Sequence, residues 1–150
     1  MGESNTAEGL IEQLHLAPHP EGGWYCETWR GPDRADGRAG GTAIIFLLKS
    51  GERSHWHTVD AEEMWLWQAG DPLVLQIAES DEGPVEMITL GRDVGSGEAL
   101  QGLVPTGAWQ AAVPRAGIHG YSLVSCVVVP GFNFAGFTLA PPHWEPGKQP

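Results

Sequence analysis

Two histidines and an acidic pair stand close together in the middle of the chain, in the segment GERSHWHTVDAEEMWLWQAG of residues 51–70. His55 and His57 are two residues apart, so in an extended strand both imidazoles point to the same side. Glu62 and Glu63 follow closely, and a carboxylate on the next strand can reach the same point. Two imidazoles and one carboxylate suit a divalent transition metal and leave positions open for a substrate. The alternative is that these side chains meet in a water-filled barrel mouth and bind nothing.

The strand that carries the acidic pair has two different faces. Glu63, Trp65 and Trp67 share one face, whereas Glu62 lies on the other. A ligand pocket needs the polar and aromatic face inside, so we expect Glu63 to point inward. Trp65 and Trp67 would then be stacking walls for a ligand. The alternative is that both tryptophans are core residues, which is the usual fate of paired strand aromatics.

Composition limits the class of protein. At 150 residues the chain is long enough for one domain with a single buried core. Seven tryptophans and many short apolar runs separated by Gly or Pro indicate an all-β domain rich in turns. The net charge is −11 with only eight Lys and Arg, which argues against a nucleic-acid partner.

The N-terminus shows no secretory signal, and no stretch of the chain is apolar enough to span a membrane. We therefore expect a cytoplasmic protein with no membrane partner. Cys26 and Cys126 are a hundred residues apart and form no metal-binding spacing. Both are expected to be reduced and buried.

The elements around the central segment follow from the apolar pattern. A helix is expected over residues 6–16, capped by Asn5, with an apolar stripe that packs on the body of the protein. The predicted strands outside the central segment are 24–29, 42–48, 73–77, 85–90 and one near 121–129. The proline-rich tail, residues 141–150, is expected to be extended or disordered.

Several segments resemble those of one protein superfamily. The central segment resembles the first cupin motif, a Gly, then HxH, three to five residues, a Glu, six residues and a second Gly. Glu63 and Gly70 fit the second half of that motif. Residues 102–114 resemble the second cupin motif, but Gln110 stands where that motif has a histidine. The opening PHPEGG and the ending PGFNFAGF are similar to the DUF985, or cupin 5, family, and together the matches cover about residues 10–140.

This resemblance implies a fold and an assembly. The fold would be a double-stranded β-helix, the jelly-roll barrel of cupins, formed by residues 1–150 as one domain with the short helix outside. Related cupins pair through one sheet, which implies a homodimer. Trp56 lies between the two histidines and so should face outward, where a second copy would cover it. The alternative is that Trp56 is buried within one subunit.

The resemblance also implies a metal site with one altered ligand. His55, His57, Glu63 and Gln110 would hold a divalent metal such as Ni, Zn, Fe or Mn. An amide oxygen is a weaker ligand than imidazole, so we expect weak or partial occupancy, or no metal at all. In that case Gln110 would instead hydrogen-bond the ligand.

The implied function is the binding of a small polar, sugar-like metabolite in the barrel. An enzyme of the isomerase, epimerase or lyase type would abstract a proton next to a carbonyl, with His57 and Glu63 as catalytic groups. His19, Glu21 and Glu27 could reach the pocket mouth, where His19 and Glu27 would contact the ligand, although His19 and Glu21 could equally only pin a turn. The alternative function is a ligand-binding or sensor protein without catalysis. The sequence identifies neither the substrate nor the metal.

Overall fold

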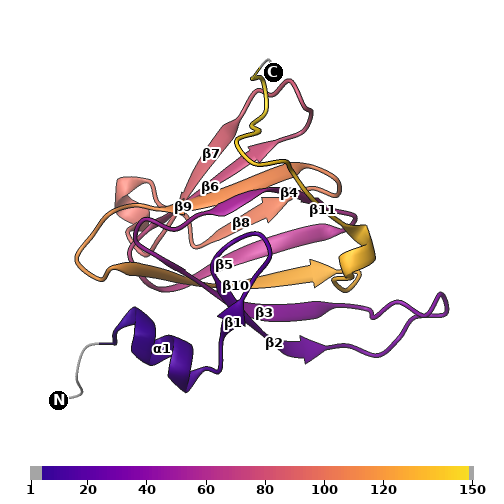
Figure 1. Ribbon diagram of the computed structural model, residues 1–150, viewed down its shortest axis with the longest axis horizontal. Coiled ribbons are helices and arrows are strands. Elements are labelled where there is room, and N and C mark those ends of the chain that lie inside the picture. Colours follow the sequence, from indigo (N-terminus) through magenta and orange to yellow (C-terminus); the bar gives the residue numbers. More distant parts are fainter. Residues whose placement is uncertain (1–4, 149–150) are drawn as a thin grey trace.

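In a computed structural model that describes residues 5–148, the chain forms two antiparallel sheets (Figure 1). The first sheet has six strands in the order β1 (Ala17–Pro18), β2 (Trp24–Arg30), β3 (Thr42–Lys49), β10 (Tyr121–Val129), β5 (Glu62–Gly70) and β8 (Gln101–Val104). The second has five strands in the order β11 (Phe137–Leu139), β4 (Ser54–Val59), β9 (Trp109–Pro114), β6 (Leu73–Ala78) and β7 (Glu86–Leu90). The described residues also form two short 3₁₀ turns, η1 (Val94–Ser96) and η2 (Phe134–Gly136). The predicted all-β jelly-roll barrel is confirmed.

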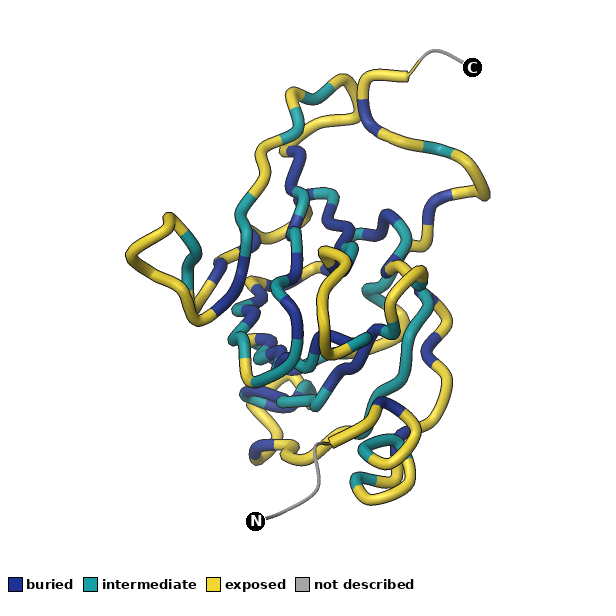
Figure 2. The backbone as a smooth tube through the Cα atoms, turned by 90° about the vertical axis from the view of Figure 1, so that its left-hand side faces the viewer, coloured by how far each residue is buried: buried dark blue, intermediate teal, exposed yellow. Residues whose placement is uncertain are grey.

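The apolar run of β3 is continuous because both faces of this strand are covered. Phe46 and Leu48 point between the two sheets, where they join the largest buried cluster. Leu47 and Ile45 point the other way and pack against the helix side. A strand covered on both faces loses the alternation of apolar and polar residues. Figure 2 shows the result, with buried positions concentrated in the strands and exposed ones in the connecting loops.

The helix α1 (Ala7–Gln13) lies on the outside of the six-stranded sheet. Its N-cap is Thr6, whose hydroxyl accepts a hydrogen bond from the Gly9 N–H at 3.0 Å. The predicted cap at Asn5 is therefore one residue early, and the helix is shorter than the expected 6–16. The predicted stripe does pack on the sheet, through Ala7, Leu10, Ile11 and Leu14.

The tail after β11 turns back over the sheet that contains β4 and β9. Ala140 donates its N–H to the carbonyl oxygen of Trp56 at 2.9 Å, and the ring of Trp144 lies 4.4 Å from that of Trp109. This tail leaves Trp56 only 3% exposed. The expectation of an exposed Trp56 is therefore wrong, and the described tail residues 141–148 contain turns. The homodimer loses this support and stays a prediction.

No helix among residues 5–148 is long and apolar enough to cross a membrane.

Candidate functional site

A cavity of about 620 Å³ lies between the two sheets, with side chains from both of them in its wall. Strands β2, β3, β5 and β10 supply one side, and β4 supplies the other. The loop between β1 and β2 and the loop after β10 close the remaining sides. The lining residues are His15, Ala17, His19, Glu21, Tyr25, Cys26, Glu27, Arg30, Thr42, Ile44, His57, Val59, Glu63, Cys126, Val128, Phe132, Asn133 and Phe134.

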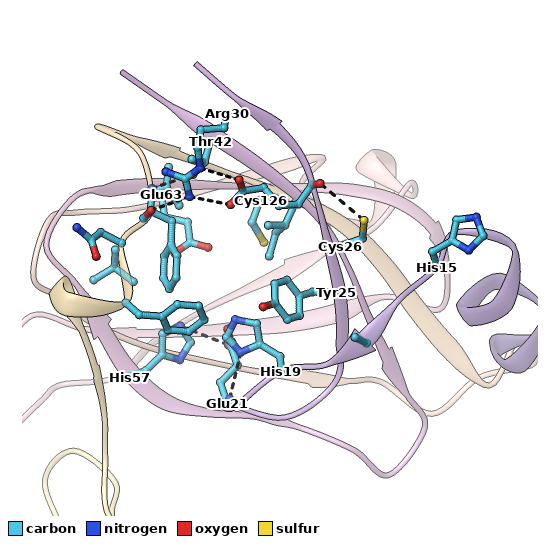
Figure 3. A pocket seen from close by; sticks show the side chains of 18 residues that line it. His15, His19, Glu21, Tyr25, Cys26, Arg30, Thr42, His57, Glu63 and Cys126 are labelled. Atoms are coloured by element: carbon cyan, nitrogen blue, oxygen red, sulfur yellow. Dashed lines mark hydrogen bonds and ion pairs between the residues drawn. The ribbon is translucent and has the colours of Figure 1, made fainter. Parts of the chain in front are cut away.

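Glu21 joins two imidazoles at the base of this cavity (Figure 3). Its Oε1 lies 3.2 Å from Nδ1 of His19, and its Oε2 lies 3.3 Å from Nε2 of His57. The hydroxyl of Ser54, which is fully buried, donates to the same Oε2. The three groups that contact this one carboxyl come from the β1–β2 loop and from β4, so the fold itself brings them together.

The glycines after Glu21 explain how its side chain reaches the cavity. Gly22 has φ of 109°, and a Cβ there would collide with the carbonyl oxygen of Arg53. Only glycine tolerates this combination of backbone angle and close approach. The turn brings the Glu21 carbonyl within 2.7 Å of the His55 N–H, which ties the loop to β4.

Hydrogen bonds to the backbone determine where each imidazole carries its proton. Nδ1 of His57 lies 2.7 Å from the carbonyl oxygen of His55, which only accepts, so Nδ1 carries the proton and Nε2 is the basic atom. The backbone N–H of Glu21 donates to Nδ1 of His19 at 3.1 Å, so the proton of neutral His19 is on Nε2. The basic nitrogens of both rings therefore face the Glu21 carboxyl.

Burial shifts the pKa of each group toward its neutral form. Loss of hydration raises the pKa of Glu21 to about 8, against the opposing hydrogen bond from Ser54. The same cause raises the pKa of Glu63 to about 7, opposed by the nearby His57. Burial lowers the pKa of His19 to about 4 and also lowers the pKa of His57. Near pH 7 the Glu21 carboxyl is therefore neutral, and its single proton can be donated to only one of the two imidazole nitrogens.

A β-bulge in β4 separates the two histidines that the sequence predicted to converge. Ser54 pairs with Ala112 and His57 pairs with Gln110, so three steps along β4 face two along β9. The extra residue breaks the alternation of side-chain direction. His57 enters the cavity, whereas the His55 ring turns away and its Nε2 lies 2.9 Å from the carbonyl oxygen of Pro141. The predicted convergence of His55 and His57 is therefore wrong.

Gln110 lies behind the cavity wall, between Glu63 and Trp65. Its Oε1 accepts the indole N–H of Trp65 at 2.8 Å, and its Nε2 donates to Oε1 of Glu63 at 3.1 Å. An indole N–H only donates, which fixes the orientation of the amide. The amide therefore orients the Glu63 carboxyl. Glu63 points inward as expected, whereas its neighbour Glu62 is exposed.

The two strand tryptophans do not line the cavity. Trp65 is 1% exposed and packs against Phe46 in the core, with 5.9 Å between the ring centres. Trp67 donates its indole N–H to the carbonyl oxygen of Asp71 at 3.1 Å. Both rings therefore adopt the core alternative, and the predicted stacking walls are not found at these positions. The aromatic rings of the cavity wall come instead from Tyr25, Phe132 and Phe134.

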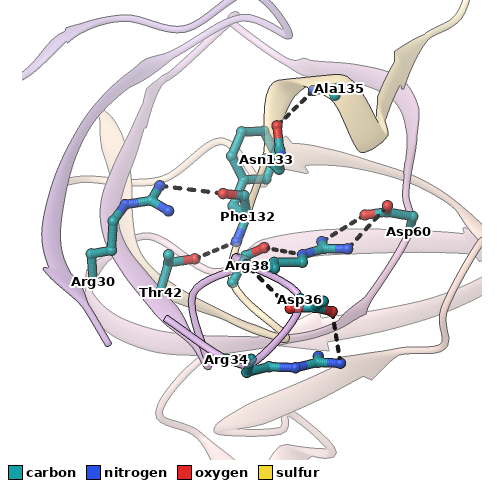
Figure 4. A network of polar contacts seen from close by, with 10 residues as sticks. Arg30, Arg34, Asp36, Arg38, Thr42, Asp60, Phe132, Asn133 and Ala135 are labelled. Carbon is teal, nitrogen blue, oxygen red and sulfur yellow. Dashed lines mark hydrogen bonds and ion pairs between the residues drawn. The ribbon is translucent and has the colours of Figure 1, made fainter. Parts of the chain in front are cut away.

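The loop of residues 130–136, here called the roof loop, closes one side of the cavity (Figure 4). The Phe132 N–H donates to the hydroxyl of Thr42 at 2.8 Å. Arg38 donates to a carbonyl oxygen of the loop at 2.8 Å and forms two bonds to the Asp60 carboxylate, at 2.7 and 3.1 Å. The roof loop is thus attached to β3 and to the loop before it.

Glu27 lies at the mouth, as the sequence predicted, but it is paired. Arg30 donates to both of its carboxylate oxygens, at 2.8 and 2.9 Å, and also to the carbonyl oxygen of Phe132 at 3.2 Å. This arginine therefore links the mouth to the roof loop. His19, the other residue expected there, lies deeper and is 8% exposed.

The four residues expected to hold a metal do not form that set. His57 and Glu63 line the cavity, but His55 points away and the Gln110 oxygen accepts the Trp65 N–H. Within residues 5–148, no group of three or more His, Cys, Asp or Glu side chains is arranged to hold a metal ion. The donor set therefore does not fit the predicted centre, and we derive no chemical step through a metal.

The central residue of the site, Glu21, was placed near the mouth by the sequence but received no role. The Gly-Gly pair after Glu21 was the sequence signal for this position, because two glycines allow a sharp bend there. Ser54 and Tyr25 were missed entirely. Nothing in the local pattern marks Ser54, since its partner is 33 residues away.

Comparison with known proteins agrees with this architecture. The model of the DUF985 family, which belongs to the cupin superfamily, matches residues 8–140. A solved structure of a protein from Shewanella oneidensis is 39% identical, with a TM-score of 0.84 over 91% of this chain and 85% of that chain. A hypothetical protein from Leishmania major is 38% identical, with a TM-score of 0.83 over 91% and 88% of the two chains. An uncharacterized protein of Saccharomyces cerevisiae is 26% identical over 90% of this chain and 75% of the yeast protein. On the match over residues 8–140 and these structural relatives, the chain belongs to the DUF985 family of the cupin superfamily.

Proposed function

We propose that the cavity binds a small polar metabolite and catalyses proton transfer at a carbon next to a carbonyl, as an isomerase, epimerase or lyase does. One observation carries the proposal: Glu21 contacts the basic nitrogens of both His19 and His57 at the base of a cavity that also exposes Glu63. Perturbed acids and bases that meet in a cleft are typical of active sites. A purely structural role would not require four buried titratable side chains around one cavity.

The groups divide into two roles. Glu63, which Gln110 holds and which ionises above a pH of about 7, accepts the proton from the substrate carbon. Glu21, which stays neutral up to a pH of about 8 because burial raises its pKa, donates a hydrogen bond to the carbonyl oxygen as negative charge develops there, and His57 Nε2 lies behind its carboxyl. The resulting enolate then takes a proton back at carbon or expels a leaving group. Atoms and electrons balance without any external oxidant or reductant.

Hydrogen exchange in D₂O tests this chemistry directly. We would incubate the protein with dihydroxyacetone, D-fructose, D-glucosamine and pyruvate and follow loss of the C–H signal next to the carbonyl by proton NMR. Wild type should exchange at least one probe faster than the rate without protein, and His57→Asn and Glu21→Gln should lose most of that acceleration. Equal exchange in wild type and in both variants would refute the proposed reaction.

A binding protein without catalysis is the second candidate. The observation in its favour is the aromatic part of the wall, where the rings of Phe132 and Phe134 meet edge to face at 4.8 Å. Such rings bind a ligand by contact area and need no reactive group. A ligand that raises the melting temperature but shows no exchange in D₂O would favour this function.

A further inference from the structure

The charges in the cavity wall are unbalanced. Among the described residues, the side chains that line it include three glutamates, whereas its only permanent cation is Arg30. That guanidinium is already bonded to both carboxylate oxygens of Glu27 and to the carbonyl of Phe132. The inner part of the cavity therefore presents Glu21 and Glu63 without a fixed positive charge.

The two imidazoles at the base, those of His19 and His57, do not replace the missing cation, and the third imidazole of the wall, that of His15, is exposed. Nδ1 of His19 accepts the backbone N–H of Glu21, so a second proton there would place two donors against each other. Nε2 of His57 faces Oε2 of Glu21, so any proton on it is held by that carboxyl. A ligand carboxylate or phosphate would find no free cation at the base of the cavity and would be buried beside acidic groups, which is strongly unfavourable.

A positively charged ligand group meets the opposite situation. Glu21 and Glu63 line the same cavity from different segments, so their charges repel each other when both are ionised. A cation near them would lower the pKa of both carboxyls and offset this repulsion. The aromatic part of the wall adds to this, because faces of Phe and Tyr rings attract cations. Figure 3 shows Tyr25 beside His19, with its hydroxyl directed into the cavity.

From this arrangement we infer that the cavity selects a small polar molecule that carries an ammonium group, held between the carboxylates of Glu21 and Glu63 beside the aromatic rings of the wall. A volume of about 620 Å³ suits a metabolite of the size of an amino sugar or a larger amino alcohol. The inference rests on the proposed function in one respect, that the same cavity holds the ligand.

Protonation supports the same ligand class. Burial raises the pKa of Glu63 to about 7 and that of Glu21 to about 8 when no cation is present. Binding of an ammonium group should therefore release protons to the solvent. From pH 6 to pH 7 the ionised fraction of a carboxyl with a pKa near 7 rises about fivefold while the ammonium of an amino sugar stays mostly protonated, so the affinity should rise by about the same factor.

Matched ligands that differ only in charge provide the test. We would measure binding of D-glucosamine, D-glucose and D-glucuronate by calorimetry and by thermal shift at pH 6 and pH 7, where the amine is mostly protonated. The amine should bind at least tenfold more tightly than the acid, and its affinity should rise about fivefold with pH. Titration in two buffers of different ionisation enthalpy should show proton release.

Two neighbouring residues on β5 provide the matched variants. Glu63→Gln retains the acceptor that Gln110 uses and should weaken glucosamine binding at least tenfold, whereas the exposed Glu62→Gln should leave it unchanged. Glu21→Gln should weaken binding in the same way and serves as the second variant if Glu63→Gln does not fold.

Three results would overturn the inference: tighter binding of glucuronate than of glucosamine, equal losses in the Glu62 and Glu63 variants, or no binding of any of the three sugars. The outcome is separable from that of the proposed reaction. Glucosamine that binds without exchange in D₂O would refute the reaction and support the inference, whereas exchange confined to uncharged or anionic probes would do the opposite.

Discussion

Replacing Glu21 by Gln should remove part of the dependence of stability on pH. Burial raises the pKa of Glu21 to about 8, from an ordinary value of 4.5 in the unfolded chain. Between these two values the folded protein keeps a proton that the unfolded chain has lost. The free energy of unfolding therefore falls as pH rises from 4.5 toward 8, whereas below pH 4.5 Glu21 is protonated in both states and causes no loss of stability. An amide does not titrate, so the variant lacks this loss.

The size of the effect follows from the pKa difference. Each pH unit over which one proton separates the two states changes the free energy of unfolding by about 1.4 kcal/mol. Between pH 5 and pH 7.5 the variant should therefore gain up to about 3 kcal/mol relative to wild type. Sharing of the proton with His57 reduces this upper value. His19 titrates in the opposite sense at lower pH, but it does so in both proteins and largely cancels.

Urea unfolding at pH 5, 6 and 7.5 would measure the difference. Wild type should be compared with Glu21→Gln, which changes the cavity, and with the control Glu62→Gln, which changes only an exposed residue. The control should run parallel to wild type within about 0.5 kcal/mol, as expected for a surface substitution. A difference between Glu21→Gln and wild type that stays constant from pH 5 to pH 7.5 would refute the reasoning, because Glu21 would then be ionised throughout.

Three further substitutions test the metal set, the bend and the roof loop. Gln110→His should leave nickel and zinc binding unchanged in calorimetric titration, because His55 points away from the cavity and position 110 lies behind its wall; a tenfold gain in affinity would show that a metal site can form there. Gly22→Ala should cost about 2–3 kcal/mol in urea unfolding because its Cβ collides with a backbone carbonyl, and a loss below 0.5 kcal/mol would contradict the described bend. Arg38→Ala should cost about 1–3 kcal/mol and speed amide hydrogen exchange in residues 131–136, and unchanged exchange there would show that the arginine does not hold the roof loop.

Much of the fold could be predicted because its signals are local or shared with a family. The turn-rich apolar pattern and the two cupin-like motifs point to one jelly roll. The continuous run of β3 correctly indicates a strand covered on both faces. The helix stripe was also correct, since Leu10 and Leu14 need only regular spacing to meet the sheet. Its N-terminus was misplaced by one residue because Asn5 and Thr6 are both good caps.

The site was harder to predict because it depends on a defect in the regular pattern. Strict alternation along β4 put His55 beside His57, and one additional residue in the strand reversed that result. Nothing in the sequence Ser-His-Trp-His predicts a bulge, because the bulge arises from the pairing of β4 with β9. Trp56 was predicted to be exposed for a related reason. Its cover comes from a tail more than 80 residues later in the chain.

The hydrogen-bonded chain from Trp65 through Gln110 to Glu63 gives the protein an optical signal of its own. The indole of Trp65 is shielded from water, so its emission depends mainly on nearby charges and on its bond to the amide. Ionisation of Glu63 places a negative charge at the far end of that amide and alters the electric field at the ring. The difference in emission between wild type and Trp65→Phe, which retains the other six tryptophans, should therefore follow the state of the cavity, with no dye attached, during a pH titration or when a ligand binds.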